Sequence, residues 1–164
     1  MNVDHILDTM NRTGVAYLLF GGVNFLLRHA PVLTFDIDLW IEDGEANHRR
    51  CERALAELAA EWGIADDDWG PVAQKGPGWL DRQAVFCLNS PHGAIDIFRS
   101  VKGFDNWTAS RCQARDESTA AGIRYLGLSD TDMLRCQYAL DEPQRKSHRV
   151  RVLEAAIGKP SSTP

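Results

Sequence analysis

Two predicted strands that frame a pair of glycines constrain the fold of this chain more than any other part of its sequence. Val15–Phe20 is a continuous run of six apolar residues, which predicts a strand that is buried on both faces. Gly21 and Gly22 follow it directly. Phe35–Glu42 alternates apolar with polar residues, which predicts a second strand. Two aspartates occupy polar positions of this strand and therefore lie on one face of it.

The rest of the chain alternates helical and extended patterns. Apolar spacing and turn residues predict helices over Val3–Asn11, Val23–His29, Gly44–Trp62, the region around Trp107, Ser129–Leu140 and Pro143–Ile157, and strands over Gln83–Leu88, Ala94–Phe98 and Ile123–Leu126. Between Gly63 and Leu80 the sequence predicts a long loop. We expect residues 161–164 to be a disordered tail. No repeat or linker divides the chain, so residues 1–160 are predicted to form a single domain.

The composition is that of an ordinary globular protein with a negative net charge. The charged fraction is 25%, the hydrophobic fraction is 44% and the formal net charge is −5, which excludes a surface that is basic throughout. The charge is uneven, because residues 143–164 carry a net charge of +4. No apolar run approaches the roughly 18 residues that would span a bilayer. We therefore expect a cytoplasmic protein without a membrane partner.

Three aspartates are the main candidates for chemistry. Asp36 and Asp38 occupy positions i and i+2 of a predicted strand, so their carboxylates point the same way, roughly 6–7 Å apart along the chain. Asp96 lies in Ala-Ile-Asp-Ile-Phe, where a charge between apolar neighbours is costly unless a cation neutralises it. Three converging carboxylates suit a two-metal site for phosphoryl transfer. We predict these three residues to be catalytic and metal-binding.

Residues around the glycine pair are candidates for binding a phosphate. Gly21 and Gly22, between a strand and a helix, would let backbone N–H groups approach a polyphosphate, although in isolation a simple turn explains such a pair. Thr34 either contacts phosphate, orients the first aspartate or serves only as a strand former, and Asn24 leaves similar alternatives open. Arg28 either reaches a triphosphate or forms a solvated helix end.

In this order the motifs resemble the nucleotidyltransferases of the DNA polymerase beta superfamily, in particular the small AbiEii/MenA-like (DUF6036-like) branch. The shared pattern is two glycines, then Thr-x-Asp-x-Asp, then a single aspartate on a later strand. This chain has Gly21-Gly22, Thr34-Phe35-Asp36-Ile37-Asp38 and Ile95-Asp96-Ile97. The resemblance covers roughly residues 15–100 and extends loosely to the helical C-terminal part, about 129–158.

The resemblance implies both a fold and an activity. The fold is α/β (α+β), a mixed β-sheet flanked by helices with a helical C-terminal part. The activity is transfer of a nucleoside monophosphate from a nucleoside triphosphate to a hydroxyl group, with Mg²⁺ or Mn²⁺ held by Asp36, Asp38 and Asp96 and with Asp96 as the base. The acceptor it implies is tRNA or a protein, and a toxin that pairs with an antitoxin is one of the roles it suggests.

Other assignments stay open at the level of the sequence. Basic residues of the family's last helices match Arg145, Lys146, Arg149 and Arg151, of which Lys146 is the candidate nucleotide ligand. Many relatives carry arginine where this chain has Val32. The alternative function is therefore a catalytically inactive module of the same fold that binds a nucleotide or a partner. A glycosyltransferase that uses Asp-x-Asp to hold manganese is disfavoured, because the chain is short for that fold.

Overall fold

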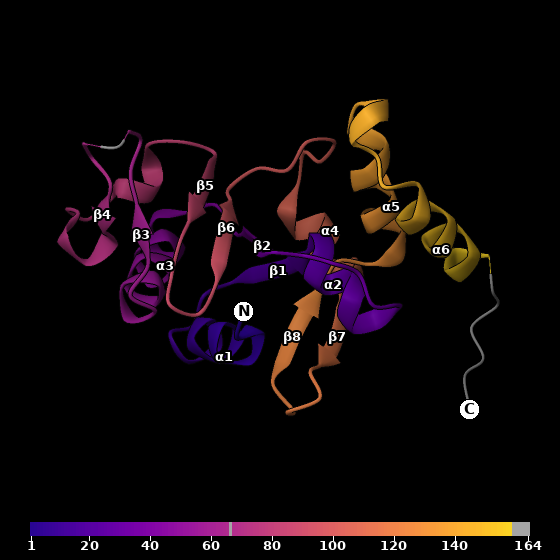
Figure 1. Cartoon of the computed structure of the whole chain (residues 1–164), viewed down its shortest axis with the longest axis horizontal. Coiled ribbons are helices and arrows are strands. Elements are labelled where there is room, and N and C mark those ends of the chain that lie inside the picture. Colours follow the sequence, from indigo (N-terminus) through magenta and orange to yellow (C-terminus); the bar gives the residue numbers. More distant parts are fainter. Residues whose placement is uncertain (66, 159–164) are drawn as a thin grey trace.

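The computed structural model describes residues 1–65 and 67–158, which form a six-stranded sheet with helices on both faces (Figure 1). Helices are labelled α, 3-10 helices η and strands β. In chain order the elements are α1 (Val3–Arg12), β1 (Tyr17–Phe20), α2 (Gly21–Arg28), β2 (Asp36–Ile41), α3 (Glu45–Glu57), β3 (Glu61–Trp62), β4 (Gly70–Pro71), η1 (Val72–Gln74), η2 (Trp79–Asp81), β5 (Val85–Leu88), β6 (Ala94–Phe98), α4 (Trp107–Gln113), β7 (Arg115–Ser118), β8 (Arg124–Gly127), α5 (Asp130–Ala139), η3 (Glu142–Gln144) and α6 (Ser147–Ile157).

The main sheet is mixed. Its strand order is β5-β6-β2-β1-β8-β7, and β3 pairs with β4 in a separate two-stranded sheet. The pairs β2–β6 and β1–β8 are parallel, and the other neighbours are antiparallel. The mixed sheet, the flanking helices and the helical C-terminal part confirm the expected α/β (α+β) fold class.

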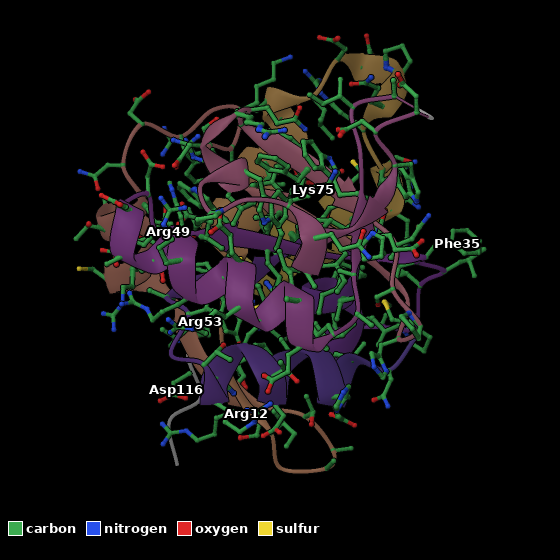
Figure 2. All side chains as sticks on the ribbon, turned by 90° about the vertical axis from the view of Figure 1, so that its left-hand side faces the viewer. Arg12, Phe35, Arg49, Arg53, Lys75 and Asp116 are labelled. Carbon is green, nitrogen blue, oxygen red and sulfur yellow. The ribbon has the colours of Figure 1, made fainter. Side chains whose placement is uncertain are left out.

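The two faces of the sheet bury different side chains, because residues alternate along each strand. Ile37 and Leu39 of β2 are fully buried in a cluster that includes residues of α1 and α3, which lie side by side (Figure 2). On the opposite face, Trp40 packs in a second cluster with Met133 of α5 and Leu153 of α6. The aspartates of β2 share the face of Trp40, so they lie on the side of the sheet that the C-terminal helices cover in part.

Most predicted elements are confirmed to within a few residues. Strand β1 is buried along its whole length, and β5 and β6 form the expected antiparallel hairpin. Ser129 caps α5, since its Oγ accepts a hydrogen bond of 3.2 Å from the backbone N–H of Asp132. Helix α2 begins at Gly21 rather than at Val23.

The predicted helix over Gly44–Trp62 is wrong at its C-terminal end. Helix α3 ends at Glu57, and the last two residues of the predicted helix form β3. Ala59 has a φ of 50°, and the N–H of Ala60 donates a 3.0 Å hydrogen bond to the carbonyl of Leu55. This is the pattern of a Schellman cap, in which glycine usually occupies the left-handed position. Because alanine occupies that position, the sequence carries no glycine signal for the end of the helix.

The segment Gly63–Leu80 contains more regular structure than the predicted loop. Strand β4 pairs with β3, and η1 and η2 follow it. Trp79 is buried and stacks on Trp62, with ring centroids 5.3 Å apart. Aromatic packing of this kind supplies the stabilisation that a solvated loop would lack.

Two more differences concern the C-terminal third. Strand β7 is not predicted from the sequence, because its residues Arg-Asp-Glu-Ser show no apolar alternation. Pro143 lies in η3 and does not open the last helix, since α6 begins at Ser147. The prediction of a disordered tail at 161–164 lies outside the described residues. Within the described ranges, every helix is too short or too polar to cross a membrane.

Candidate active site

The three predicted aspartates lie on the same face of two neighbouring parallel strands. Strand β2 carries Asp36 and Asp38, and β6 carries Asp96. The register pairs Asp38 directly with Asp96, and paired strands are about 4.8 Å apart. Tertiary structure therefore brings together carboxylates that are far apart in the sequence.

Two of the carboxylates are oriented by neighbours that belong to the predicted motif. Thr34 Oγ1 donates to Asp36 Oδ1 over 3.2 Å. The backbone N–H of Gly22 donates to Asp38 Oδ2 over 3.4 Å. This contact agrees with one of the roles considered for Thr34, the orientation of Asp36.

The glycine pair is required by the close approach of α2 to these side chains. Gly21 has a φ of +65°, and a Cβ at this position would lie 1.9 Å from Asp38 Oδ2. A Cβ on Gly22 would lie 2.3 Å from Thr34 Oγ1. The N-cap residue of α2, Phe20, supplies no side-chain cap, and the N–H of Gly22 in its first turn points toward the carboxylate of Asp38. Such a helix end favours a bound phosphate.

The electrostatics of the cluster are unfavourable in the absence of a cation. Burial, followed by the charges of Asp36 and Asp96, raises the pKa of Asp38 to about 7, against the opposing effects of the Gly22 N–H and Arg149. Burial also raises the pKa of Asp96, and the charge of Asp36 adds to this effect. Mutually perturbed carboxylates of this kind are typical of functional sites.

Arg149, on α6, is the basic residue that reaches the cluster. Its Nη2 lies 3.1 Å from the position that a Cβ on Gly22 would occupy, and its guanidinium carbon lies 5.9 Å from the ring centroid of Phe25. Lys146, the candidate nucleotide ligand predicted from the same basic set, is exposed and precedes the first residue of α6. The last helix was predicted to begin at Pro143, whereas α6 begins at Ser147. The sequence therefore did not indicate which basic residue of this helix faces α2.

Arg28 and Asn24 attach α2 to the connection between β8 and α5. Arg28 Nη1 donates to the carbonyl of Leu128 over 2.8 Å, and its Nη2 pairs with Asp130 at 2.9 Å. Asn24 is fully buried and its Nδ2 donates to the same carbonyl over 3.1 Å. These contacts are structural, and the structure displays no contact between either residue and the three aspartates.

Cys87, on β5, is a neighbour of the site that the sequence analysis missed. It is exposed and lies directly across the strand pair from Asp96. Partial desolvation of its sulfur, together with the charge of Asp96, raises the pKa of the Cys87 thiol to about 11. The alternation of side chains along the predicted hairpin could have placed Cys87 on the same face as Asp96. That inference requires the register between β5 and β6, which the sequence does not give.

The set of donors fits a hard divalent cation. Carboxylate oxygens are the ligands that Mg²⁺ prefers, and a cation would relieve the repulsion that raises the pKa of Asp38. Among residues 1–65 and 67–158, no three His, Cys, Asp or Glu side chains already converge as a finished metal site. Asp36 and Asp38 are instead turned toward Thr34 and Gly22. Strands β2 and β6 already place the three aspartates on one face. Binding of a metal would require only that their side chains turn toward it.

Comparison with known proteins identifies the fold but no sequence family. No family model and no curated protein matches the sequence. LnuA, a lincosamide antibiotic adenylyltransferase solved with lincomycin bound, aligns with a TM-score of 0.62 at 14% identity, over 94% of this chain and 95% of its own. The antibiotic-resistance factor ANT(2'')-Ia aligns in its solution structure with a TM-score of 0.61 at 12% identity, over 95% and 82% of the two chains. Its complex with adenylyl-2''-tobramycin aligns with a TM-score of 0.59 at 14% identity, over 95% and 87%.

The TM-scores and the coverage of these alignments demonstrate a shared architecture, although the sequence identities are low. The aligned regions include the mixed sheet that carries the three aspartates and the C-terminal helices, since nearly the whole chain is covered. The chain therefore has the polymerase-beta-type nucleotidyltransferase fold.

Proposed function

We propose that this chain is a nucleotidyltransferase, which moves a nucleoside monophosphate from a nucleoside triphosphate to a hydroxyl group of an acceptor. One observation carries the proposal: Asp36, Asp38 and Asp96 lie on one face of the neighbouring strands β2 and β6, where burial and the charges of the other two aspartates raise the pKa of Asp38 to about 7. Three neighbouring carboxylates repel one another when all are ionised and no cation is bound. The cluster therefore favours binding of a cation together with its phosphate ligand. The shared fold supports the same activity.

The reaction exchanges one phosphorus–oxygen bond for another. The acceptor oxygen forms a bond to the α-phosphorus, the bond from that phosphorus to the oxygen bridging the β-phosphate breaks, and pyrophosphate leaves with the electron pair. Asp96 takes the proton of the acceptor hydroxyl, a role helped by burial, which raises its pKa. Arg149 and the first N–H groups of α2 bind the negative charge of the phosphates.

Asp36, Asp38 and Asp96 would hold Mg²⁺, or Mn²⁺ in its place. The ion supplies Lewis acidity, which neutralises charge on the triphosphate and lowers the pKa of the attacking hydroxyl. The glycine pair contributes by keeping side-chain atoms out of the space that the triphosphate needs, and Thr34 fixes the direction of Asp36.

Candidate acceptors come from two sources. The motif resemblance implies tRNA or a protein, with a toxin–antitoxin role among its consequences. The structural neighbours contain lincomycin and an adenylylated tobramycin, which adds small hydroxyl compounds to the candidates. Each class presents the hydroxyl group that the proposed chemistry requires.

A labelled-nucleotide screen tests the proposal. The protein is incubated with each α-labelled nucleoside triphosphate, Mg²⁺ and, in separate reactions, total tRNA, cell protein, lincomycin or tobramycin. We expect label to reach one acceptor class, and Asp36→Ala to abolish the transfer. Asp105→Asn is the matched control, because Asp105 is exposed and forms no ion pair with any described residue. Absence of transfer to every acceptor, or equal transfer by Asp36→Ala, contradicts the proposal.

A second candidate is a module of the same fold that binds a nucleotide or an antitoxin-like partner without turnover. It is favoured by Val32, where many relatives carry arginine, and by the engagement of Arg28 with Asp130. This alternative predicts that a nucleoside triphosphate with Mg²⁺ raises the melting temperature while no label is transferred. Measured turnover that disappears in Asp36→Ala would exclude it.

A further inference from the structure

One part of the catalytic face of the sheet is left uncovered, at β5 and β6. The register of these strands places Val85 opposite Phe98 and Cys87 opposite Asp96, so the four side chains share the face of Asp38. The alternate residues of both strands are buried in the core on the other face. In Figure 1, α5 and α6 lie at the right, toward the opposite side of the sheet from β5.

This uncovered face is apolar around a single charge. Val85 is 38% exposed and Cys87 is exposed, while Phe98 is half-buried and packs edge-on against Phe20 with ring centroids 4.9 Å apart. Asp96 is the one charged residue in β5 or β6. Covering these exposed apolar side chains would contribute binding free energy to an acceptor that lies beside Asp96.

The chemistry of the face limits what can bind there. A polyamine requires several carboxylates to pair with its ammonium groups, and the three at this site are assigned to metal and proton transfer. A polyphosphate backbone requires cations, and neither strand carries one. An apolar surface gains free energy from covering apolar area, at about 25 cal/mol per Å². The acceptor that complements it is therefore an amphipathic alcohol.

We infer that the face formed by Val85, Cys87 and Phe98 is the acceptor platform, and that the acceptor is a small alcohol with an apolar side and at most one cationic group. The inference rests on the proposed nucleotidyltransferase activity and deepens it. The acceptor lies with its apolar side on β5 and β6, and its hydroxyl group points to Asp96. Nucleic acid and polycationic acceptors are excluded from this surface.

Cys87 provides a built-in probe of the platform. The full chain is alkylated with iodoacetamide, with Mg²⁺ and a non-hydrolysable nucleoside triphosphate in every sample, and modification of each cysteine is followed by mass spectrometry of its peptides. Long reaction times are used, because the raised pKa of the Cys87 thiol makes it slow to react. Lincomycin, which has one basic amine and an apolar side, represents amphipathic alcohols, and tobramycin and total tRNA represent the excluded classes. We expect lincomycin to slow alkylation of Cys87 several-fold. Cys112, which is exposed on α4, is the internal control and should react at an unchanged rate.

Substitution at Val85 separates binding from chemistry. Val85→Asp places a carboxylate on the apolar surface and should raise the KM for the amphipathic acceptor about tenfold, with the KM for the nucleotide unchanged. Ile64→Asp places the same charge at an exposed apolar side chain outside the platform and should leave both constants near their original values. Equal effects of the two substitutions on both constants would indicate a structural cause and overturn the inference.

The outcomes distinguish the platform from the proposed function. Transfer of label without shielding of Cys87 overturns the platform and keeps the activity. Shielding by lincomycin without transfer keeps the platform and overturns the activity. Shielding by tobramycin or tRNA that equals or exceeds shielding by lincomycin overturns the stated acceptor class.

Discussion

Gly21 illustrates how a single residue decides whether the site can form. Its φ of +65° belongs to the left-handed region, and a Cβ there would overlap Asp38 Oδ2 at 1.9 Å. Two separate penalties therefore apply to any side chain at this position: the backbone strain and the displacement of the Asp38 carboxylate.

Gly21→Ala should lower the free energy of unfolding by about 1–2 kcal/mol through the backbone alone and should also abolish nucleotide transfer. Gly122→Ala is the matched control, because Gly122 has a φ of +84° and open space where its Cβ would lie. The control should show a similar loss in urea denaturation with its activity retained. If both variants remain active, the close approach of Gly21 to the Asp38 carboxylate is unimportant for function.

Helix α3 shows how an element can end where its sequence pattern continues. Ala59 occupies the left-handed position of the cap with a φ of 50°, at a cost that glycine would avoid. Ala59→Gly should therefore raise the free energy of unfolding by about 1 kcal/mol, measured as a higher urea midpoint.

The opposite sign is expected for the same substitution inside a regular helix. Ala155 is exposed in α6, and Ala155→Gly should lower stability by about 0.5–1 kcal/mol. If Ala59→Gly also destabilises the protein, the assignment of the α3 cap is wrong.

Helix α6 connects the C-terminal part of the chain to the candidate active site through Arg149. Arg149→Ala should weaken binding of a nucleoside triphosphate about tenfold, because it removes a charge-assisted contact to phosphate. Isothermal titration with Mg²⁺ present measures the affinity. Arg151→Ala, at an exposed position of the same helix, should leave it nearly unchanged, and Lys146→Ala tests the residue that the sequence favoured. Equal weakening by Arg149→Ala and Arg151→Ala would mean that α6 acts only through its overall charge.

At the scale of the whole molecule, the carboxylate cluster makes stability depend on pH, and the proposed function adds a dependence on metal. The pKa of Asp38 rises from 3.8 to about 7 on folding, chiefly through burial. Its contribution to stability is therefore complete below about pH 4 and is lost as the pH rises through about 7, since the folded state then holds a charge that the unfolded state solvates better. The loss is on the order of a few kcal/mol.

In metal-free buffer, Asp38→Asn should therefore be more stable than the unsubstituted protein at about pH 8, and the difference should shrink toward about pH 5. Excess Mg²⁺ should stabilise the unsubstituted protein at about pH 8 and have little effect on Asp38→Asn. Thermal denaturation across the pH range measures both effects, with Asp105→Asn as the control for a change of charge at an exposed position. A constant difference between the two proteins at every pH would contradict the coupling of Asp38 to its neighbours.

The sequence by itself determined the local features of this protein: strand β1, the glycine pair, the placement of Asp36 and Asp38 on one face of β2, and the β5–β6 hairpin. These depend on side-chain periodicity and on backbone preferences, which act over a few residues. Only the tertiary structure decided that Asp96 pairs with Asp38, that Arg149 reaches the site in place of Lys146, and that Cys87 lies beside Asp96. The physical reason is that strand register and helix docking are set by packing between distant segments, which no local pattern specifies.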